Sequence, residues 1–189
     1  MPGLLKVGFF VMGHMTKNLI LVTGGTRSGK SSFAQNLAEA EEGRKVFIAT
    51  AEPLDQEMKK RISAHKKERP AGWDTVEEPI HLAKTVKKCG ETYDVLLIDC
   101  LTLWISNLLV NKSMNEKGIL KKISALVASC REVPARVIMV TNELGMGIVP
   151  SNRLSRLYRD LVGKANQQVV SEADEVYFLV SGIPMKLKG

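Results

Sequence analysis

The sequence contains few aromatic residues, few cysteines and no long apolar run. Aromatic residues make up 5% of the chain and are not interleaved with a run of Arg and Lys, which disfavours a nucleic-acid-binding role. The cysteines Cys89, Cys100 and Cys130 are odd in number and contain no C-x-x-C pair, which argues against a disulfide framework or a zinc site. No apolar stretch is long enough to cross a bilayer. We therefore expect a cytoplasmic protein with no membrane span.

The length and charge of the chain suit one domain that binds an anion. A chain of 189 residues with 44% hydrophobic residues can bury a substantial core, and the net charge of +7 suggests a nucleotide or phosphorylated partner. In residues 1–17 the apolar run from Val7 to Met12 is short and lacks the small-residue cleavage site of a signal peptide. We expect residues 1–17 to be a poorly ordered arm and residues 18–189 to form a single domain.

One glycine-rich stretch matches the phosphate-binding pattern G-x-x-x-x-G-K-[ST] at every fixed position. It consists of Gly24, Gly25, Thr26, Arg27, Ser28, Gly29, Lys30 and Ser31. An apolar run precedes it and a helical pattern follows, which is the context that this motif requires. Backbone N–H groups of such a loop surround an anion, with the helix N-terminus adding partial positive charge. The stretch predicts a nucleoside triphosphate site in which Lys30 reaches the outer phosphates and Ser31 holds Mg²⁺.

Strand and helix patterns alternate along the rest of the chain. We expect strands at 18–23, 45–50, 94–99, 136–141 and 175–181. We expect helices at 30–41, 55–69, 79–88, 101–109 and 119–132, and one capped by Ser151 that carries Leu154 to Val169. This alternation predicts an α/β P-loop NTPase three-layer fold, with a mostly parallel β-sheet and helices on both faces.

Several polar residues follow the predicted strands at the edge where ligands bind in open α/β sheets. Asp99 ends a buried strand, where an acid holds Mg²⁺ in phosphate-loop enzymes or caps the next helix. Glu77 and Glu78 precede Pro79, where acids are most often solvated loop residues, and one of them could accept hydrogen bonds from a guanine base. The segment from Thr141 to Glu143 is either part of the site or a strand-end turn.

His65 lies late on the charged helix predicted at 55–69. It shares a face with Met58 and Ile62, so its spacing alone favours a partly buried core-facing side chain. Nearby cations would keep the imidazole neutral, the form that can attack phosphorus, so a catalytic role is chemically open. His14 and His81 receive no role.

The size and motifs narrow the class of phosphate-loop protein. A small GTPase would carry Asn-Lys-x-Asp after a late strand, and the segment from Thr141 to Leu144 does not match it. A strand-exchange ATPase would be larger. A small-molecule kinase or nucleotidyl transferase fits best.

An ordered set of segments resembles the adenosylcobinamide kinase / adenosylcobinamide-phosphate guanylyltransferase family of cobalamin biosynthesis. The phosphate loop looks like the family form G-G-x-R-S-G-K-S. Further matches are Ile48-Ala49-Thr50-Ala51, Arg61-Ile62-Ser63-Ala64-His65-Lys66, Asp99-Cys100-Leu101-Thr102, Val140 to Pro150, Asn152-Arg153-Leu154, Asn166-Gln167, Ala173 to Val176 and Ser181-Gly182. The resemblance covers the chain from about Asn18 to its C-terminus.

The resemblance implies two reactions and a set of site residues. Adenosylcobinamide would be phosphorylated by ATP or GTP, and GMP would then pass from GTP to that phosphate through a histidine–GMP intermediate, with His65 as the matching position. The resemblance also places near the nucleotide Ala49, Thr50, Ala51, Lys66, Lys67, Glu68, Arg69, Glu77 and Asp99, with Ser31 and Asp99 serving Mg²⁺. It further implies a homotrimer and one antiparallel strand in the sheet.

Some alternatives stay open at this point. Asp99 stands where some relatives carry glutamate, which could alter metal reach, and some members perform only the guanylyl transfer. Two other classes of protein stay open as alternatives, namely a non-catalytic GTP-binding regulator and a basic nucleic-acid ATPase.

Overall fold

The computed structural model describes residues 18–53, 55–67, 69 and 71–189. Its strands are β1 (Leu19–Gly24), β2 (Lys45–Ala49), β3 (Asp74–Glu77), β4 (Val95–Asp99), β5 (Arg136–Val140), β6 (Glu175–Val180) and β7 (Ile183–Lys188). Its helices are α1 (Lys30–Glu39), α2 (Gln56–Lys67), α3 (Leu82–Gly90), α4 (Leu101–Ser106), the π-helix η1 (Asn107–Asn111), α5 (Glu116–Glu132) and α6 (Arg153–Glu172). The predicted arm at residues 1–17 lies outside the described residues.

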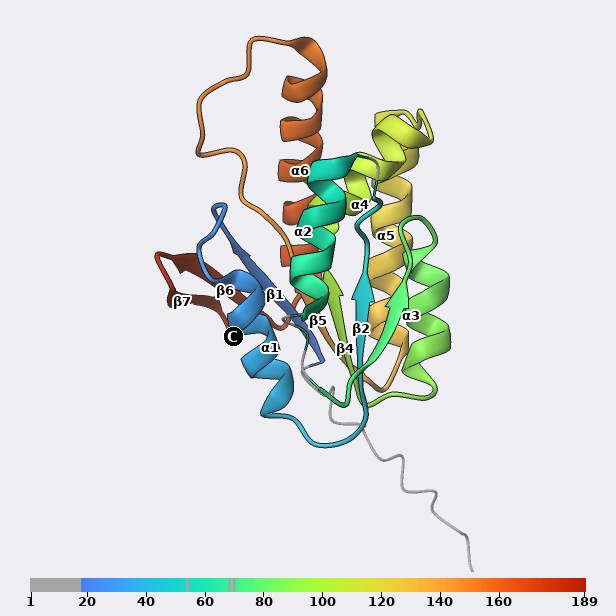
Figure 1. The fold of residues 1–189 in the computed structure, drawn as a ribbon. Coiled ribbons are helices and arrows are strands. Elements are labelled where there is room, and N and C mark those ends of the chain that lie inside the picture. Colours follow the sequence, from blue (N-terminus) through green and yellow to red (C-terminus); the bar gives the residue numbers. More distant parts are fainter. Residues whose placement is uncertain (1–17, 54, 68, 70) are drawn as a thin grey trace, which may run out of the picture.

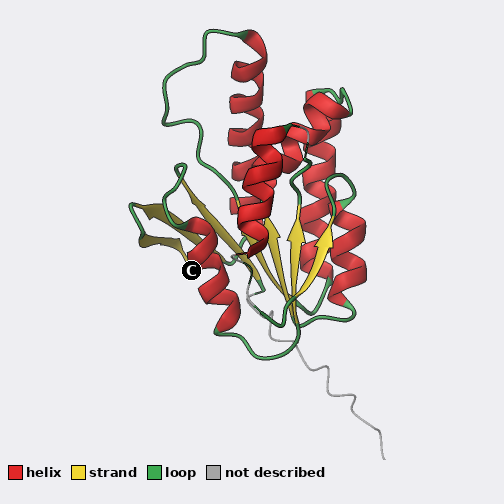
Figure 2. Cartoon of the chain, in the orientation of Figure 1, coloured by secondary structure: helices red, strands yellow, loops and turns green. Residues whose placement is uncertain are grey.

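The strands form one sheet in the order β3-β2-β4-β5-β1-β6-β7 (Figures 1 and 2). Every neighbouring pair is parallel except β6 and β7, which run antiparallel. The mostly parallel sheet predicted from the alternating pattern is therefore confirmed, as is the single antiparallel strand implied by the resemblance. Because the carboxyl ends of the parallel strands meet at one edge, this edge is where a ligand site is expected.

Both faces of the sheet are covered by helices, as the sequence predicts. Side chains alternate along β1, so Leu19 and Leu21 pack with residues of α3, α5 and α6, while Ile20 and Val22 pack with Ala34 and the rest of the α1 side. Within the described ranges, no helix combines the length and hydrophobicity needed to span a membrane.

Two strands were not predicted because each lies at an edge of the sheet. β3 has four residues, three of them exposed, so it has no apolar run to indicate a strand. The strand predicted at 175–181 is present as β6, but it is not the last strand, because Ser181 and Gly182 form a two-residue turn and β7 follows. Both turn residues have positive φ, 50° and 85°, as a tight hairpin requires. Pro184 is tolerated because β7 is an edge strand.

Three helix starts also differ from the prediction. α3 begins at Leu82 rather than at Pro79, because the Glu78 carboxylate accepts hydrogen bonds from the N–H groups of Ile80 and His81 and holds the preceding residues in a turn. α5 begins at Glu116, where the side chain of Asn115 caps it. The cap of α6 is Asn152 rather than Ser151, with its side chain accepting from Ser155 N–H over 2.8 Å. In each case a polar side chain decides the boundary.

Candidate functional site

The phosphate loop follows β1 and has a backbone that needs glycine. Gly24 has φ 148° and Gly29 has φ 89°. A Cβ at Gly24 would lie 2.5 Å from the backbone oxygen of Leu179 and 2.9 Å from Ser28 Oγ, so no larger residue fits there. The N–H of Gly182 donates to Ser28 O over 3.0 Å, which supports the loop from the β6–β7 turn. The remaining loop positions Gly25, Thr26 and Arg27 are exposed.

Lys30 begins α1 and its ammonium group reaches back over the loop. Nζ donates to Gly25 O at 2.5 Å and approaches Ser28 Oγ at 3.5 Å. Burial lowers the pKa of Lys30, while the nearby Cys100 and Asp99 oppose that shift. The cation is thus held inside the loop, where phosphate oxygens would replace the carbonyl as its partners.

Ser31 and Asp99 come together from two elements. Ser31 Oγ donates to Asp99 Oδ2 over 3.1 Å, which joins the first turn of α1 to the end of β4. A hydroxyl and a carboxylate are the hard oxygen ligands that Mg²⁺ prefers, and a phosphate-bound ion needs only one or two of them from the protein. The pair therefore fits a divalent cation. Among the described residues no cluster of three or more His, Cys, Asp or Glu side chains forms a separate metal site.

The segment Ala49, Thr50 and Ala51 lies beside Asp99 at the end of β2. Thr50 is buried, and its hydroxyl donates to Cys100 O at 2.7 Å and accepts from Cys100 N–H at 2.9 Å. Its N–H also donates to Asp99 O over 3.1 Å. The structure thus brings this segment to the predicted site, and the Thr50 side chain is used to hold the ends of β2 and β4 together.

The two adjacent glutamates have different environments. Glu78 accepts hydrogen bonds from Ile80 N–H, His81 N–H and Thr85 Oγ1 at the start of α3. Burial alone would raise the pKa of Glu78, but these hydrogen bonds outweigh it and lower the pKa. Glu77 ends β3 with a side chain that is 57% exposed and forms an ion pair with Lys66. Of the two glutamates, Glu77 therefore has the carboxylate that a guanine base could reach.

The last turn of α2 and the residues that follow it include further predicted site residues. The ion pair between Lys66 and Glu77 ties this turn to the end of β3. The guanidinium of Arg69 stacks over the Phe47 ring, with 4.7 Å from Cζ to the ring centroid. The side chains of His65 and Lys67, and all of Glu68, lie outside the described residues. His81 is exposed and precedes α3, in keeping with the absence of an assigned role.

A polar network at the end of β5 is the main feature that the sequence predictions did not specify. Asn142 Nδ2 donates to Thr102 Oγ1 at 2.9 Å, and Asn142 O accepts from Asn166 Nδ2 at 3.1 Å. Thr141 Oγ1 donates to Asn166 Oδ1 at 2.9 Å, and Tyr158 OH donates to Thr102 O at 2.8 Å. The polar segment from Thr141 was noted as a possible strand-end site, but no sequence spacing indicates its partners on α4 and α6.

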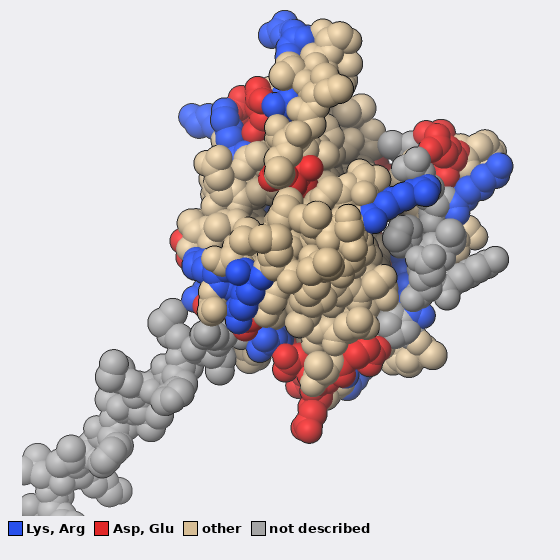
Figure 3. All heavy atoms as spheres, turned by 90° about the vertical axis from the view of Figure 1, so that its left-hand side faces the viewer, with Lys and Arg blue, Asp and Glu red and all other residues tan. Residues whose placement is uncertain are grey.

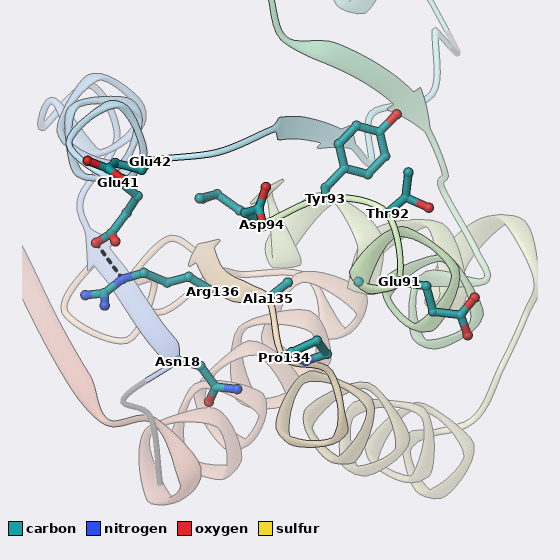
Figure 4. Close-up of a pocket in the computed structure, with 12 residues that line it drawn as sticks. Asn18, Glu41, Glu42, Glu91, Thr92, Tyr93, Asp94, Pro134, Ala135 and Arg136 are labelled. Atoms are coloured by element: carbon teal, nitrogen blue, oxygen red, sulfur yellow. Dashed lines mark ion pairs between the residues drawn. The ribbon is translucent and has the colours of Figure 1, made fainter. Parts of the chain in front are cut away.

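A hollow lies at the opposite edge of the sheet and is separate from these residues. It has a volume of about 460 Å³ and is lined by residues at the amino ends of β1, β4 and β5, among them Asn18, Asp94 and Arg136. Figure 4 shows Glu41 paired with Arg136 there, at 3.0 Å between Oε1 and Nε. The phosphate loop, Lys30 and Asp99 lie at the carboxyl edge, so this hollow does not coincide with the predicted nucleotide site.

The charges on the face shown in Figure 3 do not form one basic surface. On the face shown in Figure 3, Lys and Arg lie in separate groups among uncharged side chains. This distribution gives no support to a continuous nucleic-acid track on that face.

Comparison with known proteins decides the family. A sequence model described as cobinamide kinase / cobinamide phosphate guanyltransferase matches residues 20–187. The chain belongs to this family. It is 41% identical over 181 residues to the bifunctional adenosylcobalamin biosynthesis protein CobU of Escherichia coli, covering 90% of this chain and 99% of that protein. It is 45% identical over 170 residues to the bifunctional adenosylcobalamin biosynthesis protein CobP of Pseudomonas aeruginosa, covering 89% and 96%.

A solved structure supports the fold assignment. An ATPase from the type III secretion system of pathogenic bacteria superposes with a TM-score of 0.53 at 13% identity. The alignment covers 87% of this chain and 51% of that one, so the chain spans about half the length of the ATPase. At this identity the likeness shows the P-loop NTPase fold alone, which confirms the predicted fold class.

Proposed function

We propose that this enzyme phosphorylates adenosylcobinamide and then transfers GMP from GTP to the new phosphate, in cobalamin biosynthesis. The observation that carries the proposal is the contact between Ser31 and Asp99 beside the buried Lys30, in a chain of this family. Lys30 and the loop amides stabilise negative charge on the phosphates, which is where most of the catalysis of phosphoryl transfer lies. When bound, Mg²⁺ held by Ser31 and Asp99 supplies further charge neutralisation.

In the kinase step, the aminopropanol hydroxyl of adenosylcobinamide attacks the γ-phosphorus of ATP or GTP. The bond from that phosphorus to the β-phosphate oxygen breaks, the nucleoside diphosphate leaves and the hydroxyl proton is released. In the second step, a neutral His65 nitrogen attacks the α-phosphorus of GTP and pyrophosphate leaves. An oxygen of the substrate phosphate then displaces His65, giving adenosylcobinamide-GDP.

Residues around α2 would bind the nucleotide and recognise its base. Glu77 accepts hydrogen bonds from the guanine N1–H and amino group, because its carboxylate is accessible whereas that of Glu78 is used at the start of α3. Ala49, Thr50 and Ala51, with Lys66, Lys67, Glu68 and Arg69, complete the nucleotide surroundings. The ion pair between Lys66 and Glu77 supports this arrangement, since it brings the turn after His65 to the edge that carries Asp99.

We also propose that residues 18–189 act as one catalytic domain in a cytoplasmic homotrimer. The loop between β5 and α6 supports self-association, because Met146, Ile148 and Val149 are 80%, 96% and 64% exposed. Apolar side chains gathered on one exposed segment are typical of protein interfaces. Sedimentation equilibrium tests the trimer, and a monomeric active enzyme would contradict it.

The decisive experiment uses GTP labelled at the α-phosphate, with Mg²⁺ and without acceptor. We expect label on the denatured protein that is released by acid and withstands base, and that cobinamide phosphate removes from the native enzyme. His65→Ala should abolish the label, and His81→Ala, an exposed histidine before α3, is the matched control. A folded, GTP-binding protein that takes up no label would overturn the covalent mechanism and favour a plain phosphate-loop kinase or a regulator.

A second experiment tests the kinase step by itself. Transfer of labelled γ-phosphate to cobinamide is expected in the His65→Ala variant, because the hydroxyl attacks the γ-phosphorus without the histidine. No transfer by the wild type would instead identify a guanylyltransferase-only member. DNA-stimulated hydrolysis that falls steeply with salt would support a nucleic-acid ATPase.

A further inference from the structure

Asn142 lies where three strands of the nucleotide site end. Strand β5 runs between β1 and β4, and its residue Val140 is in register with Val22 on one side and with Asp99 on the other. Thr141 N–H then donates to Val22 O, and Glu143 N–H donates to Gly24 O, both over 3.0 Å. The chain after β5 therefore continues along β1 as far as the first glycine of the phosphate loop, with Asn142 in the middle of this segment.

Both the side chain and the backbone of Asn142 are fixed by other elements. Its carboxamide donates to Thr102 Oγ1 on α4 at 2.9 Å, and its carbonyl accepts from Asn166 Nδ2 on α6 at 3.1 Å. Thr102 is itself held by Tyr158, whose hydroxyl donates to its carbonyl. Such second contacts hold a functional group in one orientation before ligand binds, which is what an active-site side chain requires.

The network also reaches the start of α1, which carries Lys30. Thr102 Oγ1 lies 3.0 Å from Cys100 Sγ, and Cys100 follows Asp99 at the end of β4. Asp99 in turn accepts a hydrogen bond from Ser31 Oγ over 3.1 Å, and Ser31 directly follows Lys30. Asn142, Asp99 and Lys30 therefore belong to one cluster around the phosphate loop.

We propose that Asn142 donates a hydrogen bond to the terminal phosphate of the bound nucleoside triphosphate. A carboxamide has two N–H donors, and with one directed to Thr102 the other serves a phosphate oxygen. The carboxamide of Asn142 is neutral, so its N–H group can donate to a phosphate oxygen without the charge repulsion that a carboxylate would cause. The inference rests on the proposed nucleotide site and adds to it a residue that reads the γ-phosphate.

The test compares two ligands that differ by one phosphate, the α,β-methylene analogues of GTP and GDP, by calorimetry. The methylene bridge prevents transfer of GMP, so binding is measured without reaction. Asn142→Asp keeps the size and places a negative charge in the site, and we expect it to weaken the triphosphate analogue by about tenfold to a hundredfold while the diphosphate changes by less than about threefold. The affinity of Asn142→Ala for the triphosphate analogue should lie between the affinities of Asn142→Asp and the wild type. Asn36→Asp on the exposed surface of α1 is the charge-matched control and should leave both affinities unchanged.

A structural role gives a different result. Asp at this position can still accept a hydrogen bond from the Thr102 hydroxyl, so a merely structural Asn142 would tolerate it with both affinities retained. The proposal would be overturned if Asn142→Asp lowered the affinities for both analogues equally, or lowered neither. If Asn142→Asp does not fold, Thr102→Val releases the carboxamide and must show the same selective loss for the triphosphate. Since no corrinoid is present, this result is independent of whether the acceptor is cobinamide.

Discussion

The hydroxyl of Ser31 donates to the carboxylate of Asp99 across 3.1 Å, although the two residues are 68 positions apart in the chain. The contact joins the start of α1, which follows β1, to the end of β4. Strand β5, which leads to Asn142, lies between β1 and β4 in the sheet. It places a hydroxyl and a carboxylate oxygen side by side on rigid elements, and under the proposed function these two oxygens would hold a phosphate-bound divalent cation.

Removing either oxygen should raise the Mg²⁺ requirement. We expect Ser31→Ala and Asp99→Asn each to increase the Mg²⁺ concentration for half-maximal guanylylation by about tenfold or more. Ser32→Ala, at the next and exposed position, is the matched control. Titration of labelling against Mg²⁺ measures the effect, and equal curves for Ser31→Ala and Ser32→Ala would contradict the metal role of Ser31.

Lys30 should give the nucleotide reaction an alkaline limit. Burial lowers the pKa of Lys30 below 10.5, so its ammonium loses the proton at a lower pH than an exposed lysine does. We expect kcat/KM for the nucleotide to fall with rising pH before pH 10.5 is reached. Lys30→Met should lower kcat by about a hundredfold or more and remove this limb. Its melting temperature should not fall, because an ammonium is costly to bury.

Two neighbouring loop glycines should differ in tolerance. At Gly24 a methyl group would meet the Leu179 carbonyl at 2.5 Å, whereas at Gly25 it meets nothing within 4 Å. Gly24→Ala should therefore destabilise the protein by about 2 kcal/mol, and Gly25→Ala by less than about 0.5 kcal/mol. Denaturant unfolding of the two variants checks this, and similar losses would show that the loop adapts.

Substitutions of Glu77 and Glu78 should have different effects, the first on the selection of guanine and the second on stability. Glu77→Gln should reduce the preference for GTP over ATP in labelling by about tenfold, because a carboxamide oxygen accepts more weakly and its N–H₂ group opposes the guanine donors. Glu78→Gln should instead lower the melting temperature by weakening the turn before α3. Nucleotide competition and thermal unfolding distinguish the two, and an unchanged preference in Glu77→Gln would remove Glu77 from the guanine site.

Asp174 should make stability depend on acid pH. Burial would raise its pKa, but hydrogen bonds from Leu19 N–H, Arg131 and Asn18 N–H outweigh it and lower the pKa below 3.8. A lowered carboxyl pKa contributes stability above 3.8, and this contribution is lost as the pH falls through the folded-state value. Asp174→Asn should cost about 2 kcal/mol at pH 7, and the difference from wild type should shrink below pH 4. A difference that stays constant down to pH 2 would contradict this account.

Local sequence determined much of this protein. The phosphate loop, Lys30 and the buried strands could be predicted because each rests on near neighbours, namely glycine conformations, a helix start or a continuous apolar run. Asp99 was proposed as a site residue in the same way, because it is the acid at the end of an apolar strand. The resemblance then indicated His65, which spacing alone did not distinguish from a core-facing histidine.

The tertiary structure decided what depends on distant partners. The edge strands β3 and β7 form because β2 and β6 offer them hydrogen bonds, which no apolar pattern in either segment reports. Glu77 is available for a ligand and Glu78 is not, because the turn before α3 takes up one carboxylate and leaves the other exposed. Asn142 gains its place from Thr102 and Asn166, 40 and 24 positions away. A sequence records the side chains of such a network, but only folding sets their distances, because hydrogen bonds act over about 3 Å in space whatever the separation along the chain.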